Sequence, residues 1–301
     1  METIWKSRGW DVSHHQGRIN WDVVAQEFSA GVIDFLYIRA AYGITEDREW
    51  QRNKSCARAA GIPFGAYQYF VPWEDPRAQA RKFAWLVGEI DAGGRWHYAG
   101  SRKFPPALDV EEQGVRVLLT VDSWKYTALI EQWIDEFTAI TGMTPAPLRT
   151  ERSAFYTSAG FWNKWIRPHT KWSDHPLWIA SWTSAASPTI PADWARAEKG
   201  PFLWQWQVRS DGKEHGMESY GLDENRCIYS RQELLAGTEA PAPAPPQEPA
   251  EPQPQQPGVV EVAVPVLNIR DRAEADTTST KSVIGQTRQG VRWHVTGVAV
   301  D

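Results

Sequence analysis

The first half of the chain alternates short apolar runs with longer segments whose apolar residues recur at helical spacing. The short runs predict buried strands at residues 9–13, 35–40, 64–70 and 105–111. The longer segments predict helices that begin near Asp22, Trp50 and Asp75, and a further helix that ends at Gly142. Strands that alternate with helices in this way form βαβ units and a parallel sheet.

The second half keeps the strand pattern and loses the long helices. Further apolar runs predict strands at residues 152–158, 176–182, 201–207 and 221–223. Together the runs predict an α/β fold, a TIM-like barrel of eight strands whose last part lacks helices. The active site of such a barrel lies at the C-terminal ends of its strands, where the connecting loops gather.

Carboxyl groups stand at these strand ends. Asp109 and Glu111 end the fourth run, and their side chains point the same way because residues two apart share one face of a strand. Their backbone positions lie about 6.6 Å apart, so both can reach one sugar-sized ligand while Val110 faces the other side. Asp11 lies late in the first strand and Asp223 late in the last. The pattern predicts four carboxyl groups at one mouth of the barrel.

The pair formed by Asp109 and Glu111 suits acid catalysis. Two like charges this close raise the proton affinity of one of them. A carboxylic acid that stays protonated near neutral pH, beside one that stays ionised, can cleave a glycosidic bond. By itself Asp-x-Glu is a weak motif, because it also occurs on solvated strand ends and in cation sites. If the strand continues to Glu112, that side chain faces away from Glu111.

Composition and charge exclude several classes of function. The net charge of −5 and the pI of about 5.9 come with no basic block, so we expect no nucleic-acid partner. Cys56 and Cys227 lack metal-ligand spacing, which predicts two free thiols and leaves one long-range disulfide open. His14 and His15 are adjacent, and adjacent side chains diverge on an extended chain. No third ligand is spaced to join them, so we expect no metal and no cofactor.

The start of the chain and its hydropathy bear on its location. Residues 1–6 lack the apolar core of a signal peptide. No stretch of about 18 apolar residues could span a bilayer. These features predict a soluble chain that is made in the cytoplasm and does not insert into a membrane.

A proline-rich segment divides the chain. Residues 238–257 contain eight of the 21 prolines, which predicts a stiff spacer. At full polyproline extension such a spacer reaches about 60 Å. Beyond it, short strands are expected within residues 262–270 and 283–295. The predicted domains are a barrel at residues 1–237, a linker at 238–257 and a small all-β unit at 258–301.

Seven ordered segments resemble glycoside hydrolase family 25, the Chalaropsis-type lysozymes of bacteria, fungi and phages. They lie at residues 9–21, 65–69, 107–111, 155–158, 177–180, 204–206 and 221–223. The resemblance implies a (β/α)5β3 barrel that hydrolyses the β-1,4 bond between N-acetylmuramic acid and N-acetylglucosamine in peptidoglycan. A phage-type lysin of this kind, without a signal peptide, needs another route across the membrane to reach the cell wall.

The resemblance also implies roles for the acids. It makes Glu111 the general acid, and Asp109 the group that orients and stabilises the substrate's own 2-acetamido group. That acetamido group attacks the anomeric carbon in place of an enzyme nucleophile, and an inverting mechanism is the alternative. Asp11 and Asp223 match the family's outer acidic positions, which hydrogen-bond the sugar and set protonation. Salt bridges to barrel-mouth arginines such as Arg39 would also gather acids there.

Aromatic side chains are candidates for the wall of a sugar-binding cleft. The chain has 18 tryptophans, and flat rings edged by polar groups suit sugars. The candidates are Tyr67, Tyr69, Tyr156, Trp182 and Trp206. Packing in the core is the alternative for each, since strand residues alternate between the barrel interior and the helix layer. Trp204 and Trp206 share one face of their strand, so Gln205 is turned away from them.

Two other functions compete with a muramidase that acts on bacterial cell-wall peptidoglycan. One is a non-catalytic wall-binding protein on the same barrel, although a binder has no use for a like-charged pair that is costly to desolvate. The other is a related N-acetylhexosamine hydrolase such as a chitinase, whose longer Asp-rich strand motif is absent here. The tail from residue 258 resembles the first part of a bacterial Src-homology-3-like wall-binding module, without its closing strands.

Overall fold

The protein divides into two compact units, Met1–Ala244 and Pro245–Asp301. The computed structural model describes residues 4–92, 94–101, 103–111, 122–142, 152–167 and 172–236 of the larger unit, and the backbone of four strands of the smaller one. The segment expected to be a linker, residues 238–257, lies outside the described residues. The predicted domain boundaries therefore stay a prediction.

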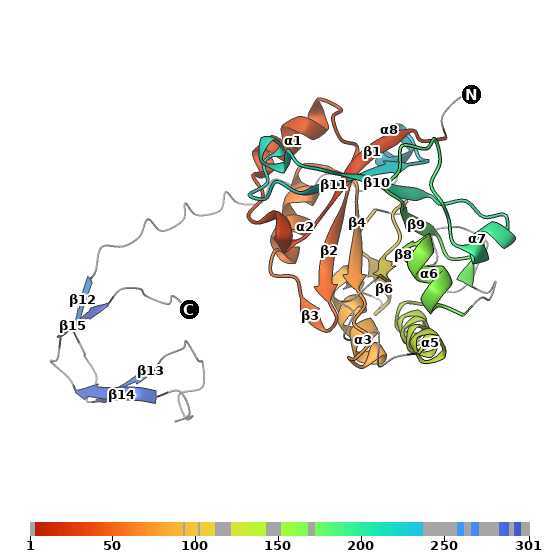
Figure 1. Ribbon diagram of the computed structural model, residues 1–301. Coiled ribbons are helices and arrows are strands. Elements are labelled where there is room, and N and C mark those ends of the chain that lie inside the picture. The colour runs from red at the N-terminus through yellow and green to blue at the C-terminus, as the bar shows by residue number, and fades with distance from the viewer. Residues whose placement is uncertain are drawn as a thin grey trace. The chain divides into compact units, whose positions relative to one another are not determined.

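A closed barrel forms the centre of the larger unit (Figure 1). Its strands, among the residues described, are β1 (Ser7–Val12), β2 (Phe35–Tyr42), β4 (Phe64–Tyr69), β7 (Ala107–Asp109), β8 (Ala154–Ser158), β9 (Leu177–Ala180), β10 (Leu203–Arg209) and β11 (Leu222–Cys227). The short strand β3 (Thr45–Glu46) extends the sheet beside β2. Adjacent strands run parallel from β1 through β10, and pairing of β1 with both β2 and β11 closes the ring. The eight-stranded barrel of the prediction is confirmed.

The direction of the last strand differs from the parallel sheet that the sequence predicts. β11 pairs antiparallel with both β10 and β1. Asp223 is consequently the second residue of β11 and not a late one as expected. Because β11 runs in reverse, its start lies at the same mouth of the barrel as the ends of the other strands. The Asp223 carboxyl group therefore lies at the predicted mouth of the barrel, although its strand runs opposite to the predicted direction.

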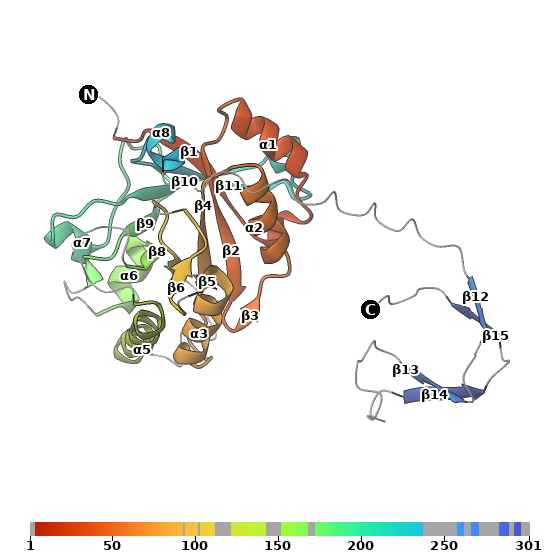
Figure 2. The same cartoon turned by 180° about the vertical axis from the view of Figure 1, so that it is seen from behind.

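Helices surround this barrel (Figures 1 and 2). They are α1 (Trp21–Ser29), α2 (Trp50–Ala59), α3 (Pro76–Val87), α5 (Ser123–Thr141), α6 (Ala159–Trp165), α7 (Ala192–Arg196) and α8 (Arg231–Leu235), with the short 3-10 helices η1 (His14–Gln16) and η3 (Gly212–His215). A hairpin of β5 (Gly88–Ile90) and β6 (Trp96–Tyr98) follows α3. Side chains cap the long helices: the Asp122 carboxylate accepts from the Lys125 N–H, and Gly142 ends α5 at a φ of 65° that favours glycine.

Side chains along the strands alternate between two apolar cores. One set points into the barrel and the other packs against the helices. On β2, Leu36 and Ile38 belong to the outer core, whereas Tyr37 lies inside, with its ring centroid 4.5 Å from that of Trp178 on β9. Two residues further along β2, the interior position is Arg39. The barrel interior therefore changes from apolar to polar toward the C-terminal ends of its strands.

The smaller unit contains two antiparallel strand pairs in its described part. β12 (Gly258–Glu261) pairs with β15 (Arg292–Val295), and β13 (Val266–Arg270) pairs with β14 (Val283–Arg288). The two segments predicted to hold strands do hold them, and β12 precedes the first of these segments. The likeness to a Src-homology-3-like module stays a prediction.

Two expectations about the whole chain can be compared with the structure. Cys56 on α2 and Cys227 on β11 are both free thiols, so the long-range disulfide that the sequence left open does not form. Among the helices described, none is both long and apolar enough to cross a membrane.

Candidate active site

A cavity of about 210 Å³ opens at the mouth of the barrel where the parallel strands end. Its walls are formed by Asp11, Ser13, His15, Gln16, Arg39, Tyr67, Tyr69, Asp109, Glu111, Tyr156, Trp178, Gln205 and Asp223. All four acids that the sequence predicted are among them. They come from the first, fourth and last barrel strands and from the residue just beyond the fourth.

Strand register brings these acids together. Asp11 of β1 lies directly opposite Asp223 of β11 in the antiparallel pair. Asp109 of β7 lies between Tyr69 of β4 and Tyr156 of β8 in the two parallel pairs. Each of these positions belongs to the interior set of its strand, and Tyr156 also packs in the apolar core inside the barrel. The layer of polar and aromatic groups therefore follows from the alternation of side chains along a closed sheet.

Asp109 is the most enclosed of the four acids, with 4% of its surface exposed. Its Oδ1 is buried and has no hydrogen-bond partner among the described residues. Burial raises the pKa of this carboxyl group well above its usual range, and the neighbouring charge of Glu111 raises the pKa further. A buried oxygen without a donor is costly, so a ligand N–H that reached Asp109 would be bound strongly.

Glu111 lies two residues beyond Asp109 and reaches the same cavity. The Val110 N–H donates to the Tyr156 carbonyl at 2.8 Å, which keeps the chain extended after β7 ends. Val110 is buried in the outer core, and Glu111 points inward, as the alternation predicts. Burial raises the pKa of Glu111 to about 7, and the charge of Asp11 raises it while Arg39 lowers it. Residue 112 lies outside the described residues, so the expectation for Glu112 stays a prediction.

Asp11 is held by two amide groups. Its Oδ2 accepts from Gln205 Nε2 at 3.0 Å and from Asn225 Nδ2 at 2.7 Å. The Gln205 oxygen in turn accepts from the Tyr156 hydroxyl at 3.0 Å and from Trp182 Nε1 at 3.1 Å, which fixes the orientation of that amide. Burial raises the pKa of Asp11, and the hydrogen bonds from the two amides oppose that rise.

Asp223 completes the group of acids. Burial raises its pKa to about 8, and the charges of Asp11 and Glu111 add to the effect. Glu111 and Asp223 thus retain protons near neutral pH, whereas Asp11 has amide donors that favour its ionised form. The cavity therefore combines acids that can donate a proton with one, Asp11, whose negative charge is stabilised by amide donors.

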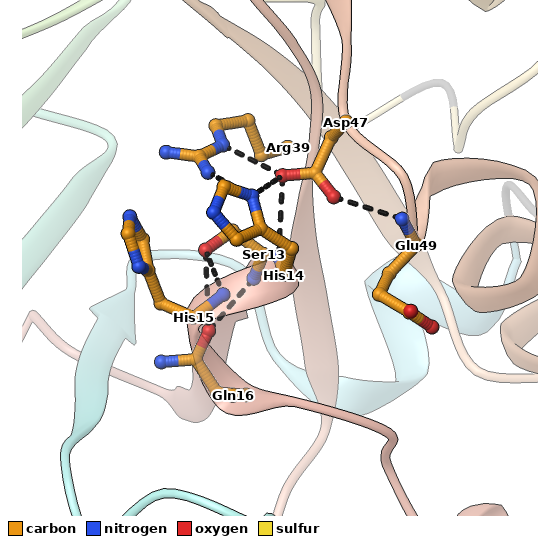
Figure 3. A network of polar contacts seen from close by, with 7 residues as sticks. All are labelled: Ser13, His14, His15, Gln16, Arg39, Asp47 and Glu49. Atoms are coloured by element: carbon orange, nitrogen blue, oxygen red, sulfur yellow. Dashed lines mark hydrogen bonds and ion pairs between the residues drawn. The ribbon is translucent and has the colours of Figure 1, made fainter.

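The predicted alternative, in which Arg39 pairs with the outer acids, is not what the structure shows. Arg39 Nε donates to Asp47 Oδ2 at 2.8 Å (Figure 3). In the part of the chain that the structure describes, neither Asp11 nor Asp223 forms an ion pair with Arg39. Arg39 nevertheless lines the cavity, so its charge acts on the acids without being bound to them.

The aromatic candidates separate into three groups. Tyr67, Tyr69 and Tyr156 line the cavity as predicted, and burial raises the pKa of each hydroxyl above its usual range. Trp182 is 66% exposed and reaches the site through its hydrogen bond to Gln205, so a sugar contact there stays a prediction. Trp206 does not reach the cavity: it packs against the outer core with the Arg226 guanidinium 3.7 Å from its ring centroid.

Several residues of the site were missed by the sequence reasoning. Gln205 faces the cavity because it is turned away from Trp204 and Trp206, which lie on the outer face of β10. Trp178 occupies the interior face of β9 in the same way. The alternation along each strand was the signal that could have found both. Asn225 had no such signal, because the predicted last strand ended at residue 223.

The two adjacent histidines behave differently from the expectation for an extended chain. They lie in η1, and their ring centroids are 4.3 Å apart rather than divergent. His15 lines the cavity, while His14 contacts Asp47 and Arg39. Within the described part of the chain, no group of three His, Cys, Asp or Glu residues is arranged to hold a metal ion.

Comparison with known proteins places this geometry in a family. The family model described as glycosyl hydrolases family 25 matches residues 10–216. Lysozyme M1 of Streptomyces globisporus is 33% identical over 236 residues, which cover 76% of this chain and 70% of that protein. An uncharacterized protein of Escherichia coli K12, YegX, is 27% identical over 231 residues, covering 76% and 72%.

Solved structures of lysozymes have folds similar to that of this chain. The bacterial lysozyme from Streptomyces coelicolor superimposes with a TM-score of 0.59 at 26% identity, over 77% of this chain and 96% of that one. A family 25 lysozyme from Aspergillus fumigatus shares the fold, with a TM-score of 0.58 at 23% identity over 76% and 97% of the two chains. The family model includes Asp11, Asp109 and Glu111 and ends before β11 and Asp223, and the chain belongs to glycosyl hydrolases family 25.

Proposed function

We propose that this protein is a peptidoglycan N-acetylmuramidase, a lysozyme that hydrolyses the β-1,4 bond between N-acetylmuramic acid and N-acetylglucosamine. The observation that carries the proposal is the pair of buried acids in a family 25 barrel. Glu111 has a pKa raised to about 7, and the adjacent Asp109 has an oxygen without a partner. The relatives named lysozyme in Streptomyces support the substrate class.

In the first step, Glu111 protonates the glycosidic oxygen as the bond to the anomeric carbon breaks. A carboxyl group whose pKa lies near the working pH is suited to this transfer. The substrate's 2-acetamido oxygen attacks the anomeric carbon and takes the place of an enzyme nucleophile. In its ionised form Asp109 accepts a hydrogen bond from the acetamido N–H and stabilises the positive charge that develops on that group.

In the second step, water attacks the anomeric carbon and the acetamido group leaves it. Glu111, now ionised, accepts the proton of that water, so the enzyme returns to its starting state. Two displacements at one carbon retain its configuration. The competing mechanism, in which an ionised acid such as Asp11 activates a water for one direct displacement, would invert it.

Digestion of purified peptidoglycan tests the function. We expect fragments that end in reduced muramic acid when the products are treated with borohydride and analysed by mass spectrometry. Fragments that end in reduced glucosamine would instead make the protein a glucosaminidase. Protein that pellets with several wall types and releases no fragments would support a wall-binding role and contradict the proposal. Proton NMR of the first product, before its anomers equilibrate, distinguishes retention from inversion.

Substitution of the proposed acid is the sharpest test of mechanism. Glu111→Gln keeps the shape of the side chain and removes the transferable proton, so turnover should fall about 10²- to 10⁴-fold. Binding to peptidoglycan, measured by pelleting, should remain. Glu89→Gln is the matched control, because Glu89 is exposed and lies on β5 away from the cavity. Near-normal turnover in Glu111→Gln would overturn the assignment.

A further inference from the structure

Arg39 is the one Arg or Lys side chain among the described residues that line the cavity. It occupies an interior position of β2, and only 5% of its surface is exposed. Its charge lowers the pKa of Asp11, Asp109 and Glu111, against the opposing effect of burial. The position and the net charge of this guanidinium therefore influence how readily these three acids ionise.

Asp47, which lies behind Arg39 and outside the cavity lining, holds the guanidinium in place (Figure 3). Asp47 follows β3 and is buried, with 1% of its side chain exposed. Its Oδ2 accepts from Arg39 Nε at 2.8 Å and from the His14 backbone N–H at 3.2 Å. Its Oδ1 accepts from the Glu49 N–H at 3.0 Å. These donors keep Asp47 ionised and lower its pKa against the effect of burial.

His14 contacts both members of this ion pair. Its Nδ1 lies 2.9 Å from Asp47 Oδ2 and 2.6 Å from Arg39 Nη2. A ring nitrogen cannot donate to the carboxylate and accept from the guanidinium at the same time. Nδ1 of His14 can therefore donate to Asp47 in one tautomer or accept from Arg39 in the other. The hydrogen bond from Arg39 Nε to Asp47 forms with either tautomer.

We propose that Asp47 is a positioning residue for catalysis: it fixes Arg39 beside the acids and balances its positive charge, and so sets the proton affinity of Glu111. Asp47 is not among the residues that line the cavity, and its shortest side-chain bond to a residue that does is the one from Arg39. The inference rests on the proposed function, because it is Glu111 as proton donor that needs a high proton affinity.

Other charged groups around the cavity do not replace this control. Asp11, Asp109 and Asp223 line the cavity with Glu111, and the charge of Asp11 raises the pKa of Glu111 instead of lowering it. Burial, and then the charges of Arg39, His14 and Arg48, lower the pKa of His15, whereas the charge of Asp47 raises it. The three tyrosines of the wall stay protonated there, and Arg48 is exposed to solvent beside Asp47.

The test is the pH dependence of kcat/KM on soluble peptidoglycan fragments. Asp47→Asn keeps the shape and one acceptor oxygen but leaves the Arg39 charge unbalanced. The carboxyl groups then ionise more easily, and the basic limb of the profile should move about one pH unit lower. Arg39→Met removes the positive charge, and the same limb should move in the opposite direction. An unchanged limb in Asp47→Asn, or one that moves to higher pH, would overturn the proposal.

A matched control separates charge from stability. Asp193 on α7 is also buried, forms an ion pair with Arg196, and accepts from Trp162 Nε1 at 2.9 Å, outside the cavity. Asp193→Asn should therefore lower the melting temperature without moving the basic limb. If it moved the limb as Asp47→Asn does, the shift would reflect general loosening of the barrel and the proposal would fail.

A second readout does not depend on activity. The titration of Glu111 can be followed by carboxyl ¹³C NMR of the labelled full-length protein, with Glu111→Gln to assign the signal. The pKa of Glu111 should fall in Asp47→Asn and rise in Arg39→Met. If the protein cleaves no peptidoglycan but these shifts occur, the proposed function fails while the link from Asp47 to Glu111 holds. If cleavage occurs and the shifts do not, the reverse is true.

Discussion

At the scale of single residues, Asp11 and Asp223 show how neighbouring acids acquire different properties. They lie opposite each other in the β1–β11 register, yet only Asp11 accepts from the amides of Gln205 and Asn225. The acids themselves could be predicted from the sequence, because each stands near one end of an expected strand. The hydrogen bond from Gln205 to Asp11 could not be predicted, because it joins residues 194 positions apart.

The amide of Gln205 should therefore control how Asp11 titrates. In Gln205→Met, Asp11 loses one donor to its charged form, a bond worth about 1.5–3 kcal/mol. The acidic limb of kcat/KM should move to higher pH by about one to two units. Gln68→Met is the control, since Gln68 is buried but bonds to Trp133 outside the barrel. A limb that moves equally in both variants would contradict the role of Gln205.

At the scale of elements, the direction of β11 is the feature that the sequence analysis did not predict. Parallel neighbours need a crossover of a dozen or more residues, usually with a helix, whereas antiparallel ones do not. Between β10 and β11 the chain holds only the short η3, which is consistent with reversal. The boundaries of β11 were also missed, because Asp223, Glu224, Asn225 and Arg226 interrupt any apolar run. Closure of the barrel overrides the weak strand propensity of these polar residues.

Closure of the barrel also depends on close approach of β1 and β2. A Cβ added to Gly9 would lie 2.2 Å from the carbonyl oxygen of Phe35, its partner in that pair. The clash is with backbone, so Gly9→Ala should destabilise the larger unit by about 1–3 kcal/mol, measured by urea unfolding. Gly160→Ala on α6 is the matched control, because nothing lies within 4 Å of its added Cβ. That control should be neutral or stabilising.

At the scale of the whole molecule, the order of strands and helices predicted the architecture correctly. Local periodicity is sufficient for this because a barrel repeats one unit, and each unit carries its own signal. The chemistry is less local. Asp47 follows a two-residue strand that the sequence did not predict, yet it holds the one described Arg or Lys side chain of the cavity wall. Contacts of this kind are fixed by the closed fold and have no signature in neighbouring residues.

The raised pKa values of Glu111 and Asp223 should make the stability of the larger unit depend on pH. Folding raises the pKa of Glu111 from 4.5 to about 7 and that of Asp223 from 3.8 to about 8. Between these limits the folded state binds more protons than the unfolded state, so the free energy of unfolding falls as pH rises. Each group contributes at most about 1.4 kcal/mol per pH unit. His175, whose pKa burial lowers to about 4, acts in the opposite direction between pH 4 and 6.5.

Comparison of variants separates the contribution of Glu111 and Asp223 to this pH dependence from that of His175, because His175 is unchanged in all of them. The double variant Glu111→Gln, Asp223→Asn should lose less stability than the natural chain between pH 5 and 8, as measured by denaturant unfolding followed through tryptophan fluorescence. This signal reports on the larger unit, because 17 of the 18 tryptophans precede residue 237. Glu89→Gln should keep the natural slope. Equal slopes in the natural chain and the double variant would mean that folding does not raise the pKa of Glu111 or Asp223. The assignment of Glu111 as a protonated acid near pH 7 would then lose its physical basis.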